Sequence, residues 1–428
     1  MKKRIILSYL VVFIAGIIYA QPRDLNYFLD QAKKNSPLIE KNKDANKILE
    51  LNMKQTEAIL KSPEINLESN ILFAPIISHD NNINRFELTS PGATNYTGYD
   101  QANTDGGQFQ AFVTLKQPVL TGSSLKAFSS KTDISRQINE NAITLTIHEL
   151  EQLVGYQYIL CMKSKMQIDN NDSTLKQLNE QLILMQKLVD NAIYKQTDLM
   201  LLQIEYQNIV LENKTLQNDF QNNLYDLKLL CGINDQNITD IEPLELKMKL
   251  ETTENSSFLK SYKLDSLNIV AELAVNELKY KPQLNLFANA GLNTVYVPSF
   301  NRLGFSAGVT FSWNIYDGGQ RQIEVNKSKV NLHSLQFEKE QFKTQLKINH
   351  DKIQNQLNSL NEQTTSINNQ LNQYDKLYEV YQKELSQGQI SIMDFKNLLK
   401  DITAKKQEMT LMKMEKQVLI NSYNYWNY

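Results

Sequence analysis

Long stretches without proline are the feature that most limits how this chain can fold. Residues 119–242 and 299–428 contain none of the nine prolines of the 428-residue chain. Glycine is almost as rare there: Gly155 is the only one between 123 and 231, and Gly388 is the only one after 319. Because a proline in a helix interior costs about 3 kcal/mol, both stretches favour long uninterrupted helices.

Apolar residues in these stretches recur at steps of three and four, which is the period of a helix with one buried face. One such run consists of Leu175, Leu178, Leu182, Met185, Leu188 and Val189. Each stretch is therefore predicted to form a long helical hairpin. A helix from Gly122 to Ala192 would be about 105 Å long at 1.5 Å per residue, which is too long for one globular domain.

The prolines cluster where the apolar period changes to two, the period of a β-strand. Residues 283–296 and 302–316 alternate over ten or more positions, and two segments of the first half, starting at 65 and 109, do the same. The apolar positions of the four segments are Ile65, Leu67, Ile71, Phe73, Phe109, Ala111, Val113, Leu115, Leu284, Leu286, Ala288, Ala290, Leu292, Leu303, Phe305, Ala307, Val309, Phe311, Trp313 and Ile315. Four strands are predicted, each with one apolar face and one polar or small face.

Two short phrases recur at different spacings. "PEINL" at 63–67 returns as "PQLNL" at 282–286, an offset of 219, whereas Thr197-Asp198 returns as Met393-Asp394, an offset of 196. The difference of 23 residues indicates two copies of a helix–strand–strand–helical hairpin unit, the first with an insertion between its strands. The insertion falls in 76–106, which is rich in Asn, Thr, Gly, Asp and Ser, as an exposed loop would be.

The N-terminus has the features of an export signal. Lys2, Lys3 and Arg4 precede an apolar run over 5–18, and Ala20 supplies a small residue for cleavage. An uncleaved anchor is the alternative, but about 14 apolar residues are short for a membrane-spanning helix. The predicted domains are a signal peptide (1–20), a first repeat (21–232), an irregular linker (233–255) and a second repeat (256–428).

Composition and motifs exclude several functions. The net charge of −2 and the pI of about 6.2 give no electrostatic basis for binding nucleic acid. His148-Glu149 begins like a zinc-protease motif, but the second histidine is missing, and no nucleophile-elbow, Walker or dinucleotide-binding pattern occurs. The chain is expected to have no catalytic site and no cofactor, and it is not expected to be an enzyme.

Sulfur-containing residues allow two further readings. Cys161 and Cys231 have neither metal-binding nor redox-motif spacing, although an exported chain could pair them. Four methionines near the C-terminus would suit a copper-efflux protein, but methionine is more often a flexible core residue, and the core reading is favoured. These methionines are Met393, Met409, Met412 and Met414.

The four strands favour a membrane location. Strands of about 10–14 residues are long enough to cross a bilayer when tilted, and the polar face suits a water-filled lumen. A small soluble sheet packed on a helix is the alternative. A membrane-spanning sheet must close on itself, and the smallest membrane barrels have eight strands, so closure of a four-stranded chain requires several copies.

Three motifs, in order, resemble the TolC-type outer-membrane efflux family. "PQLNLFANAG" looks like its barrel strand, "GFSAGVTFSWNIYDGGQRQIEV" like its strand-to-helix passage, and "GQISIMDFKNLL" like its hairpin tip. The resemblance covers about residues 24–428. It implies an α+β membrane protein in which three chains form a 12-strand β-barrel, four strands from each, that continues into a long periplasmic α-helical barrel of coiled-coil hairpins. Two departures are "QPVLTGSSLKA", which lacks the Asp-Gly-Gly form of 317–319, and Leu398-Leu399 in place of Ala-Gln.

The same resemblance implies functional positions. The alternation places Asn285, Asn289, Ser306 and Thr310 in the lumen and Leu286, Val309, Phe311 and Trp313 against lipid. The hairpin tips, 192–199 and 388–395, would form the periplasmic entrance, with Thr197 and Asp198 on the first and Gly388, Ser391, Asp394 and Asn397 on or near the second. Gly388 would permit the turn. Asp394 either lines the closed entrance or caps a helix together with Ser391, whereas Asp198 is expected to be a cap. Ile390 stands where some members have a latching arginine.

The implied function is a passive exit duct in the cell outer membrane, with the helical tunnel in the periplasm. Its partners would be two further copies of the chain, outer-membrane lipid, a periplasmic adaptor and an inner-membrane pump of the RND, ABC or MFS type. A type I protein-secretion duct with the same architecture is one alternative. A periplasmic coiled-coil scaffold or adaptor that never enters the membrane is another.

Overall fold

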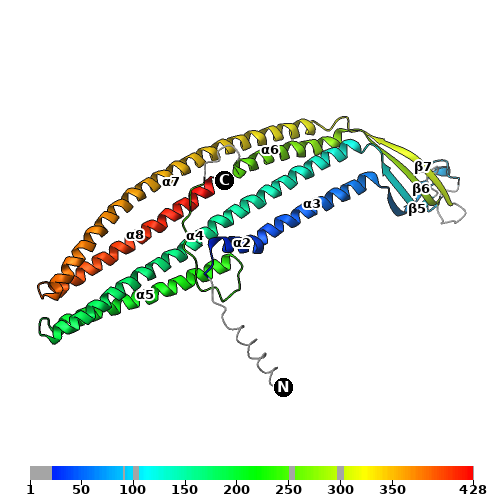
Figure 1. The fold of residues 1–428 in the computed structure, drawn as a ribbon. Helices are drawn as coiled ribbons and strands as arrows, with labels where there is room; N and C mark the ends of the chain where they lie inside the picture. Colours follow the sequence, from blue (N-terminus) through cyan, green and yellow to red (C-terminus); the bar gives the residue numbers. More distant parts are fainter. Residues whose placement is uncertain (1–21, 90–91, 100–105, 250–255, 296–302, 428) are drawn as a thin grey trace, which may run out of the picture. The chain divides into compact units, whose positions relative to one another are not determined.

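The structure is a computed structural model that describes residues 22–89, 92–99, 106–249, 256–295 and 303–427 (Figure 1). The predicted signal peptide lies outside these ranges. The helices are α2 (Leu25–Asn35), α3 (Pro37–Lys61), α4 (Gly122–Asp190), α5 (Gln196–Leu230), α6 (Ser257–Asn276), α7 (Gln320–Ser386) and α8 (Ile392–Trp426), with the short 3₁₀ helices η1 (Asp80–Asn82) and η2 (Glu277–Tyr280). The strands are β1 (Glu64–Ala74), β2 (Ile76–Ser78), β3 (Arg85–Glu87), β4 (Tyr96–Thr97), β5 (Gly106–Pro118), β6 (Gln283–Val295) and β7 (Leu303–Ser312).

The order helix–strand–strand–long helix–shorter helix occurs twice, as α3-β1-β5-α4-α5 and as α6-β6-β7-α7-α8. The first residues of β1 and β6 are 219 positions apart (283 minus 64), and those of α5 and α8 are 196 apart (392 minus 196). Both predicted long helical hairpins are present, with α4 and α7 extending over 69 and 67 residues. Equivalent elements of the two halves are therefore separated by the same two offsets as the repeated sequence phrases. The domain bounds drawn from these offsets stay predictions.

The compact units are not the two halves of the sequence. Unit 1 combines residues up to 42 with 141–260 and 338–428, and unit 2 combines 43–140 with 261–337. Each unit thus takes segments from both halves of the chain, and α4 and α7 each contribute to both units.

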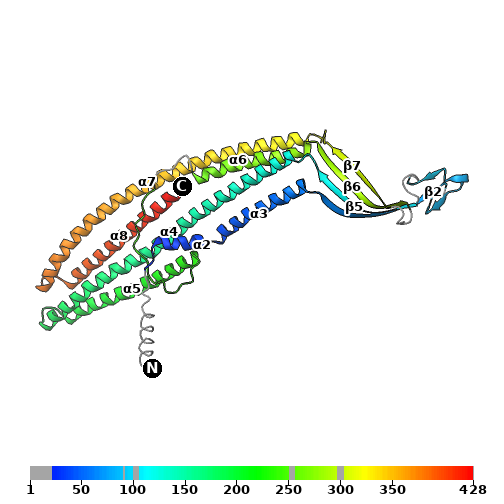
Figure 2. The same ribbon diagram turned by 45° about the vertical axis from the view of Figure 1, so that its right-hand side comes forward.

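Unit 2 contains an antiparallel four-stranded sheet in the order β1-β5-β6-β7 (Figure 2). Its register confirms the predicted alternation. Leu67 opposes Val113, Val113 opposes Ala290, and Leu286 opposes Val309, so the apolar residues of all four strands share one face. Strands β1 and β7 are the edges of the sheet.

The inserted segment 76–106 is not simply the exposed loop that its composition predicts. Within its described part, β2 pairs with β3 and β4 in a second, three-stranded sheet. The carboxylate of Asp80 accepts hydrogen bonds from the backbone N–H groups of Thr94 and Asn95 and from the Thr94 hydroxyl. The backbone donors lower the pKa of Asp80 most. The insertion is therefore a small folded module held by polar contacts.

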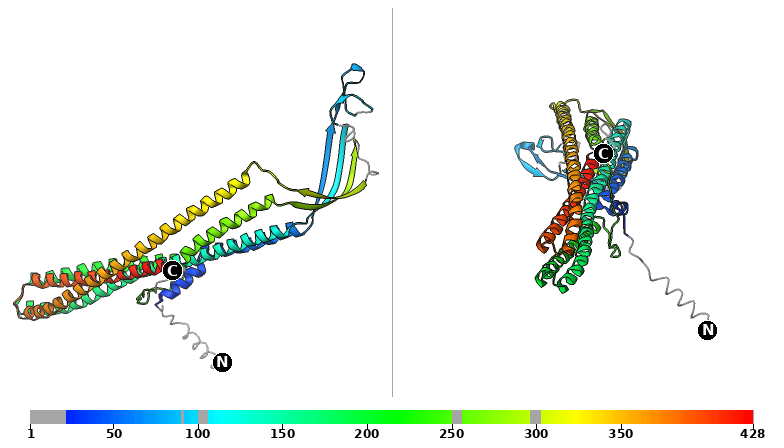
Figure 3. Two further views of the ribbon diagram at one scale, coloured as in Figure 1. Left: turned by 90° about the horizontal axis from the view of Figure 1, so that it is seen from above. Right: turned by 60° about the vertical axis from the view of Figure 1, so that its left-hand side comes forward.

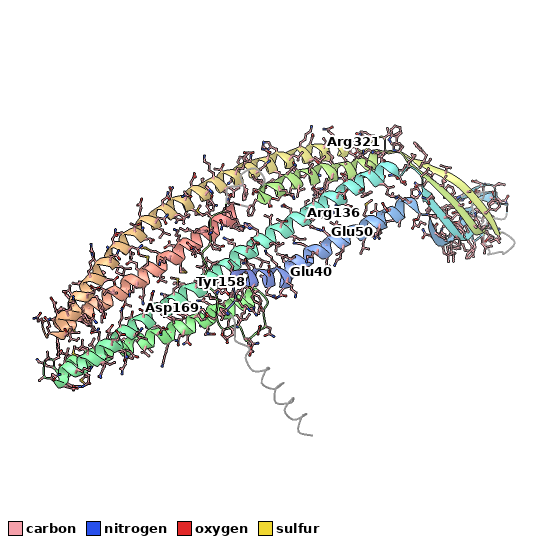
Figure 4. The ribbon with its side chains drawn as sticks, in the orientation of Figure 1. Glu40, Glu50, Arg136, Tyr158, Asp169 and Arg321 are labelled. Atoms are coloured by element: carbon pink, nitrogen blue, oxygen red, sulfur yellow. The ribbon has the colours of Figure 1, made fainter. Side chains whose placement is uncertain are left out.

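Unit 1 is helical, with α5 beside α4 and α8 beside α7 (Figure 1). Phe28 and Tyr158 are fully buried at the centre of its largest apolar cluster, which also contains both cysteines, and Figure 4 labels Tyr158 midway along α4. The Tyr158 hydroxyl lies 2.6 Å from the carbonyl oxygen of Glu242 and 3.0 Å from that of Arg23. It thus joins α4 to the linker and to the segment directly before α2.

The described part of the predicted linker, residues 233–249, contains no helix or extended strand, and its backbone is bonded to α8. The backbone N–H of Leu246 donates to Oε1 of Gln417, and that of Lys249 donates to Oδ1 of Asn424. Nδ2 of Asn424 in turn donates a hydrogen bond to the carbonyl oxygen of Lys247. Two amide side chains of one helix therefore satisfy backbone groups that lack a helical or sheet partner.

A partly buried charge cluster lies beside these contacts. The carboxylate of Glu151 lies 2.8 Å from Nζ of Lys33 and 3.7 Å from Nδ1 of the buried His148. The interaction with the nearby His148 imidazole, and then those with Lys33, lower the pKa of Glu151 from 4.5 to about 2, although burial opposes the shift. The stability that this carboxylate contributes is thus complete above about pH 4.5 and is lost as the pH falls towards 2.

Glu151→Gln is expected to lower the free energy of unfolding by about 1–2 kcal/mol at pH 7, after allowance for solvent screening. The difference from wild type should shrink as the pH falls below 4.5 and should disappear below about pH 2, where the native carboxylate becomes protonated. Denaturant unfolding at several pH values, followed by circular dichroism, measures both effects. Glu149→Gln, at an exposed neighbouring position, should change stability by less than about 0.5 kcal/mol, and an equal loss in both variants would contradict the assignment.

Candidate functional site

Both helical hairpins turn at the same end of unit 1, at 191–195 and 387–391 (Figures 1 and 3). Gly388 has φ of 72°, and a Cβ placed there would lie 2.8 Å from Cγ2 of Ile193. The predicted need for glycine at this turn is therefore confirmed, both by the backbone and by the close approach of the other hairpin. Ala192 takes the same left-handed conformation, with φ of 60°.

The helices that follow the two turns are capped differently. Oδ2 of Asp198 accepts a hydrogen bond from the backbone N–H of Lys195, so Asp198 caps α5, as its position in the sequence indicates. The hydroxyl of Ser391 accepts from the N–H of Met393 and caps α8. The reciprocal bond from Asp394 that a capping box requires is not found among the described residues.

Asp394 and Asn397 are both exposed near the start of α8. Their spacing of three places them on the same side of the helix. Thr197 is exposed at the start of α5. The Asp394 carboxylate has no hydrogen bond or ion pair within the part of the chain that the structure describes, so it is available to ligands or to other chains.

Apolar packing joins the two tips. The cluster comprises Leu178, Met185, Leu199, Leu202, Ile209, Leu385, Ile392, Phe395 and Leu399, with side chains from all four helices of the hairpins. Phe395 is fully buried one position after Asp394. The core of the tip therefore fixes the helix that presents the exposed carboxylate.

Polar contacts between the tips were not anticipated from the sequence. The Tyr194 hydroxyl donates to the carbonyl of Ile390 at 2.7 Å, and burial raises the pKa of Tyr194. Nζ of Lys396 lies 3.6 Å from Oε2 of Glu205, with both side chains mostly buried. Tyr194 and Ile390 are 196 positions apart, so the bond joins equivalent positions of the two hairpins. The bond ends at the backbone of Ile390, the position at which the resemblance implies a latching arginine in some family members.

The apolar face of the four-stranded sheet is open to its surroundings in the single chain. Leu67 is 80% exposed and Phe305 is 91% exposed. The predicted lipid-facing residues Leu286, Val309 and Phe311 lie on this face and are also exposed. Four adjacent strands therefore present one continuous apolar surface.

The opposite face is mostly polar. Asn285 opposes Thr310 and Asn289 opposes Ser306, with Nδ2 of Asn289 3.5 Å from the Ser306 hydroxyl oxygen. The four predicted lumen residues thus lie together on one face, in neighbouring strands. Phe287 interrupts this face, and Gly308 opposite it makes room, because a Cβ at Gly308 would lie 2.6 Å from the Phe287 ring.

Trp313 lies outside the strand to which the sequence assigned it. The alternation continues to 316, but β7 ends at Ser312, which opposes Gln283. The next residue on the partner side is Pro282, which has no N–H to donate, so the ladder stops there. Trp313 remains 55% exposed, and its Nε1 donates to the carbonyl of Tyr280.

The passage from β7 to α7 has the form that "DGGQR" suggested. Gly318 and Gly319 have φ of 70° and 83°. The Asp317 carboxylate accepts from the N–H groups of Gly319 and Arg321 and so caps α7. Arg321, labelled in Figure 4, pairs with Glu277 through Nε at 3.0 Å from each carboxylate oxygen.

Neither metal binding nor a disulfide receives support. Met409 and Met414 are buried, which fits the core reading, although Met393 is exposed. Among the described residues, no group of three or more His, Cys, Asp or Glu side chains is arranged to hold a metal ion. Cys161 and Cys231 are free and buried.

Of the helices that the structure describes, none combines the length and apolar character needed to cross a membrane.

By sequence, the chain matches no protein-family model and no curated protein. By structure, it is similar to CusC (13% identity, 94% of this chain and 92% of that chain, TM-score 0.71). It is also similar to the Campylobacter jejuni CmeC outer membrane channel, with 12% identity over 94% of this chain and 85% of that chain and a TM-score of 0.68. A third similar structure is the Vibrio cholerae outer membrane protein VceC, with 11% identity over 94% of this chain and 96% of that chain and a TM-score of 0.68. The resemblance to TolC-type outer-membrane efflux proteins is thus confirmed at the level of the fold.

Proposed function

We propose that the chain is the outer-membrane exit duct of a tripartite efflux system, which conducts small molecules passively to the outside. The observation that most supports this function is the exposed apolar face of the four-stranded sheet, in a fold shared with outer-membrane channels. Soluble monomers rarely expose an apolar patch of this extent. Lipid would cover this face, and the polar face with Asn289 and Ser306 would line a lumen.

Closure of the sheet would come from three copies of the chain. The free edges β1 and β7 leave unpaired backbone groups that a membrane-embedded sheet must satisfy. Pairing β1 of one copy with β7 of the next would satisfy them, and three copies give a barrel of twelve strands.

The helices next to these edges have matching apolar stripes. On α7, which follows β7, Ile323, Val330 and Phe337 are exposed at a spacing of seven. On α3, which precedes β1, Ile48, Leu51 and Ile59 are exposed on one side. A spacing of seven is typical of a seam between helices. The proposed trimer would pack the α7 stripe of one copy against the α3 stripe of the next.

Val330→Glu is expected to weaken the trimer by about 1–2 kcal/mol per interface, because it would bury an unpaired charge in the seam. Native electrophoresis and analytical ultracentrifugation in detergent measure the shift from trimer to monomer. Asn331→Glu adds the same charge at the exposed neighbouring position and should leave the trimer unchanged. Equal behaviour of the two variants would remove α7 from the proposed interface.

The proposed tunnel would open at the hairpin tips, where Asp394 and Asn397 are exposed. A periplasmic adaptor would dock on the helices near this end and connect the duct to an inner-membrane pump. These partners are inferred from the fold and from the exposed tip.

Deletion of the gene, followed by complementation, tests the proposed function. The deletion strain should accumulate a fluorescent efflux substrate, and the wild-type gene should restore its export while the product fractionates with the outer membrane. Loss of protein secretion with unchanged efflux would favour the type I secretion duct. Recovery of the native protein in the soluble periplasmic fraction would favour the scaffold or adaptor and would contradict the duct.

A further inference from the structure

A cavity of about 370 Å³ lies in unit 2 at the base of the four-stranded sheet. Helices α3 and α6 end, and α4 begins, at this base of the sheet (Figure 2). Its apolar walls come from Leu60, Leu120, Phe128, Leu278 and Leu284. Leu284 opposes Phe311 and belongs to the exposed apolar face of the sheet. The cavity is therefore continuous with the surface that the proposed function places in lipid.

The polar part of this cavity is cationic. Lys279 and Lys281, both exposed, lie at its rim, and among the described residues that line it none is acidic. Neither lysine forms an ion pair within the described part of the chain. Ser123 and Ser124, in the first turn of α4, add hydroxyl groups to the same wall. The lining thus combines apolar walls with two unpaired positive charges.

The corresponding passage of the second repeat is different. Its cavity, of about 710 Å³, is lined by Glu277, Asp317 and Glu324 as well as by basic residues. Asp317 caps α7 there, and Glu277 pairs with Arg321. At the start of α4 the sequence "QPVLTGSSLKA" supplies no acidic residue. The departure from the Asp-Gly-Gly form therefore leaves the first cavity without a carboxylate, whereas Lys279, which lines both cavities, shares the second with three.

We propose that this cavity binds an anionic phospholipid, with the phosphate beside Lys279 and Lys281 and the upper acyl chain against the apolar wall. The inference rests on the proposed membrane location of the sheet. An occupant that extends from the cavity along the apolar sheet face must be amphiphilic, and two lysines select a negative headgroup. The volume lies within the range of small-molecule sites. The bound lipid would hold the ends of α3, α4 and α6 at the membrane surface.

The test uses the full-length protein in nanodiscs that contain phosphatidylethanolamine and phosphatidylglycerol. After transfer to mild detergent, native mass spectrometry counts the lipids retained by each chain. Wild type should retain phosphatidylglycerol in preference to phosphatidylethanolamine. The double variant Lys279→Gln/Lys281→Gln should lower this retention about thirtyfold, because two lysines near an anionic lipid contribute about 2 kcal/mol together, and 1.4 kcal/mol is a factor of ten.

The matched control is Lys54→Gln/Lys329→Gln, which removes two exposed positive charges that line neither cavity, one from α3 and one from α7, and should retain phosphatidylglycerol as wild type does. Equal losses in the two double variants, or equal retention of both lipids by wild type, would overturn the inference. Equally tight binding of short-chain, water-soluble phosphatidylglycerol would also overturn it, since it would indicate a site for phosphate alone. Failure of the chain to enter nanodiscs would overturn the proposed function and this inference together, whereas insertion without lipid preference would overturn the inference alone.

Discussion

Val309→Arg is expected to prevent assembly of the chain in the outer membrane, whereas Asn289→Arg is expected to permit it. Val309 is 60% exposed on the apolar sheet face, opposite Leu286. In the proposed barrel it would face lipid, where an arginine near the bilayer midplane costs about 2–4 kcal/mol. Folded proteins are stable by only about 5–15 kcal/mol, and each trimer would contain the substitution three times.

Asn289→Arg is the matched control, because it places the same side chain one strand away on the opposite face. Asn289 opposes Ser306 among polar residues, and a charge there would remain in water. The measurement is the amount of heat-modifiable trimer in purified outer membranes at equal expression. Equal amounts of trimer from both variants would show that the two faces of the sheet have been assigned incorrectly.

The strand faces could be predicted because alternation is a local property of the sequence. Leu286 and Val309 each belong to the apolar set of their own strand. Any antiparallel register that keeps the apolar sets of neighbouring strands together places both residues on the same face. The end of β7 could not be predicted in the same way. Trp313 continues the alternation, but pairing stops because of Pro282, which directly precedes the neighbouring strand β6 and can be identified as the cause only after the register is known.

The small sheet in 76–106 was missed for another physical reason. Its strands have two or three residues, too short for a period to emerge. The module depends on Asp80, which reaches Thr94 and Asn95 across 14 and 15 positions. A polar composition predicts a loop. No local sequence pattern distinguishes such a loop from a small folded module that is held by long-range polar contacts.

At the hairpin tips, local geometry was predictable and contacts between hairpins were not. Gly388 and Ser391 act on the backbone next to them, so turn and cap could be read from neighbouring residues. The bond from Tyr194 to Ile390 joins two hairpins that lie 196 positions apart. The offset of the repeat was the available signal, since it aligns these two positions, but only packing shows that they touch.

Asp394→Asn is expected to leave the trimer intact and to reduce both the cation preference of the channel and its block by trivalent cations, the latter at least tenfold. The carboxylate of Asp394 is exposed and has no bonding partner among the described residues. Under the proposed function, three copies converge near the axis of the closed entrance, where a ring of like charges attracts cations. Asparagine keeps the shape of the side chain and removes that charge.

Asp198→Asn is the control that separates an entrance residue from a helix cap. The Asp198 carboxylate accepts a hydrogen bond from the N–H of Lys195, and asparagine is also a good capping residue. The substitution should therefore lower the free energy of unfolding by only a few tenths to about 1 kcal/mol. Ser391 performs the capping role for α8 with its own hydroxyl, so Asp394→Asn should cost still less stability. Single-channel recordings in planar bilayers at low salt measure selectivity and block for both variants. If Asp394→Asn conducts and is blocked like wild type, the carboxylate does not line the entrance, and its role reduces to the favourable interaction of an acidic side chain with the start of α8.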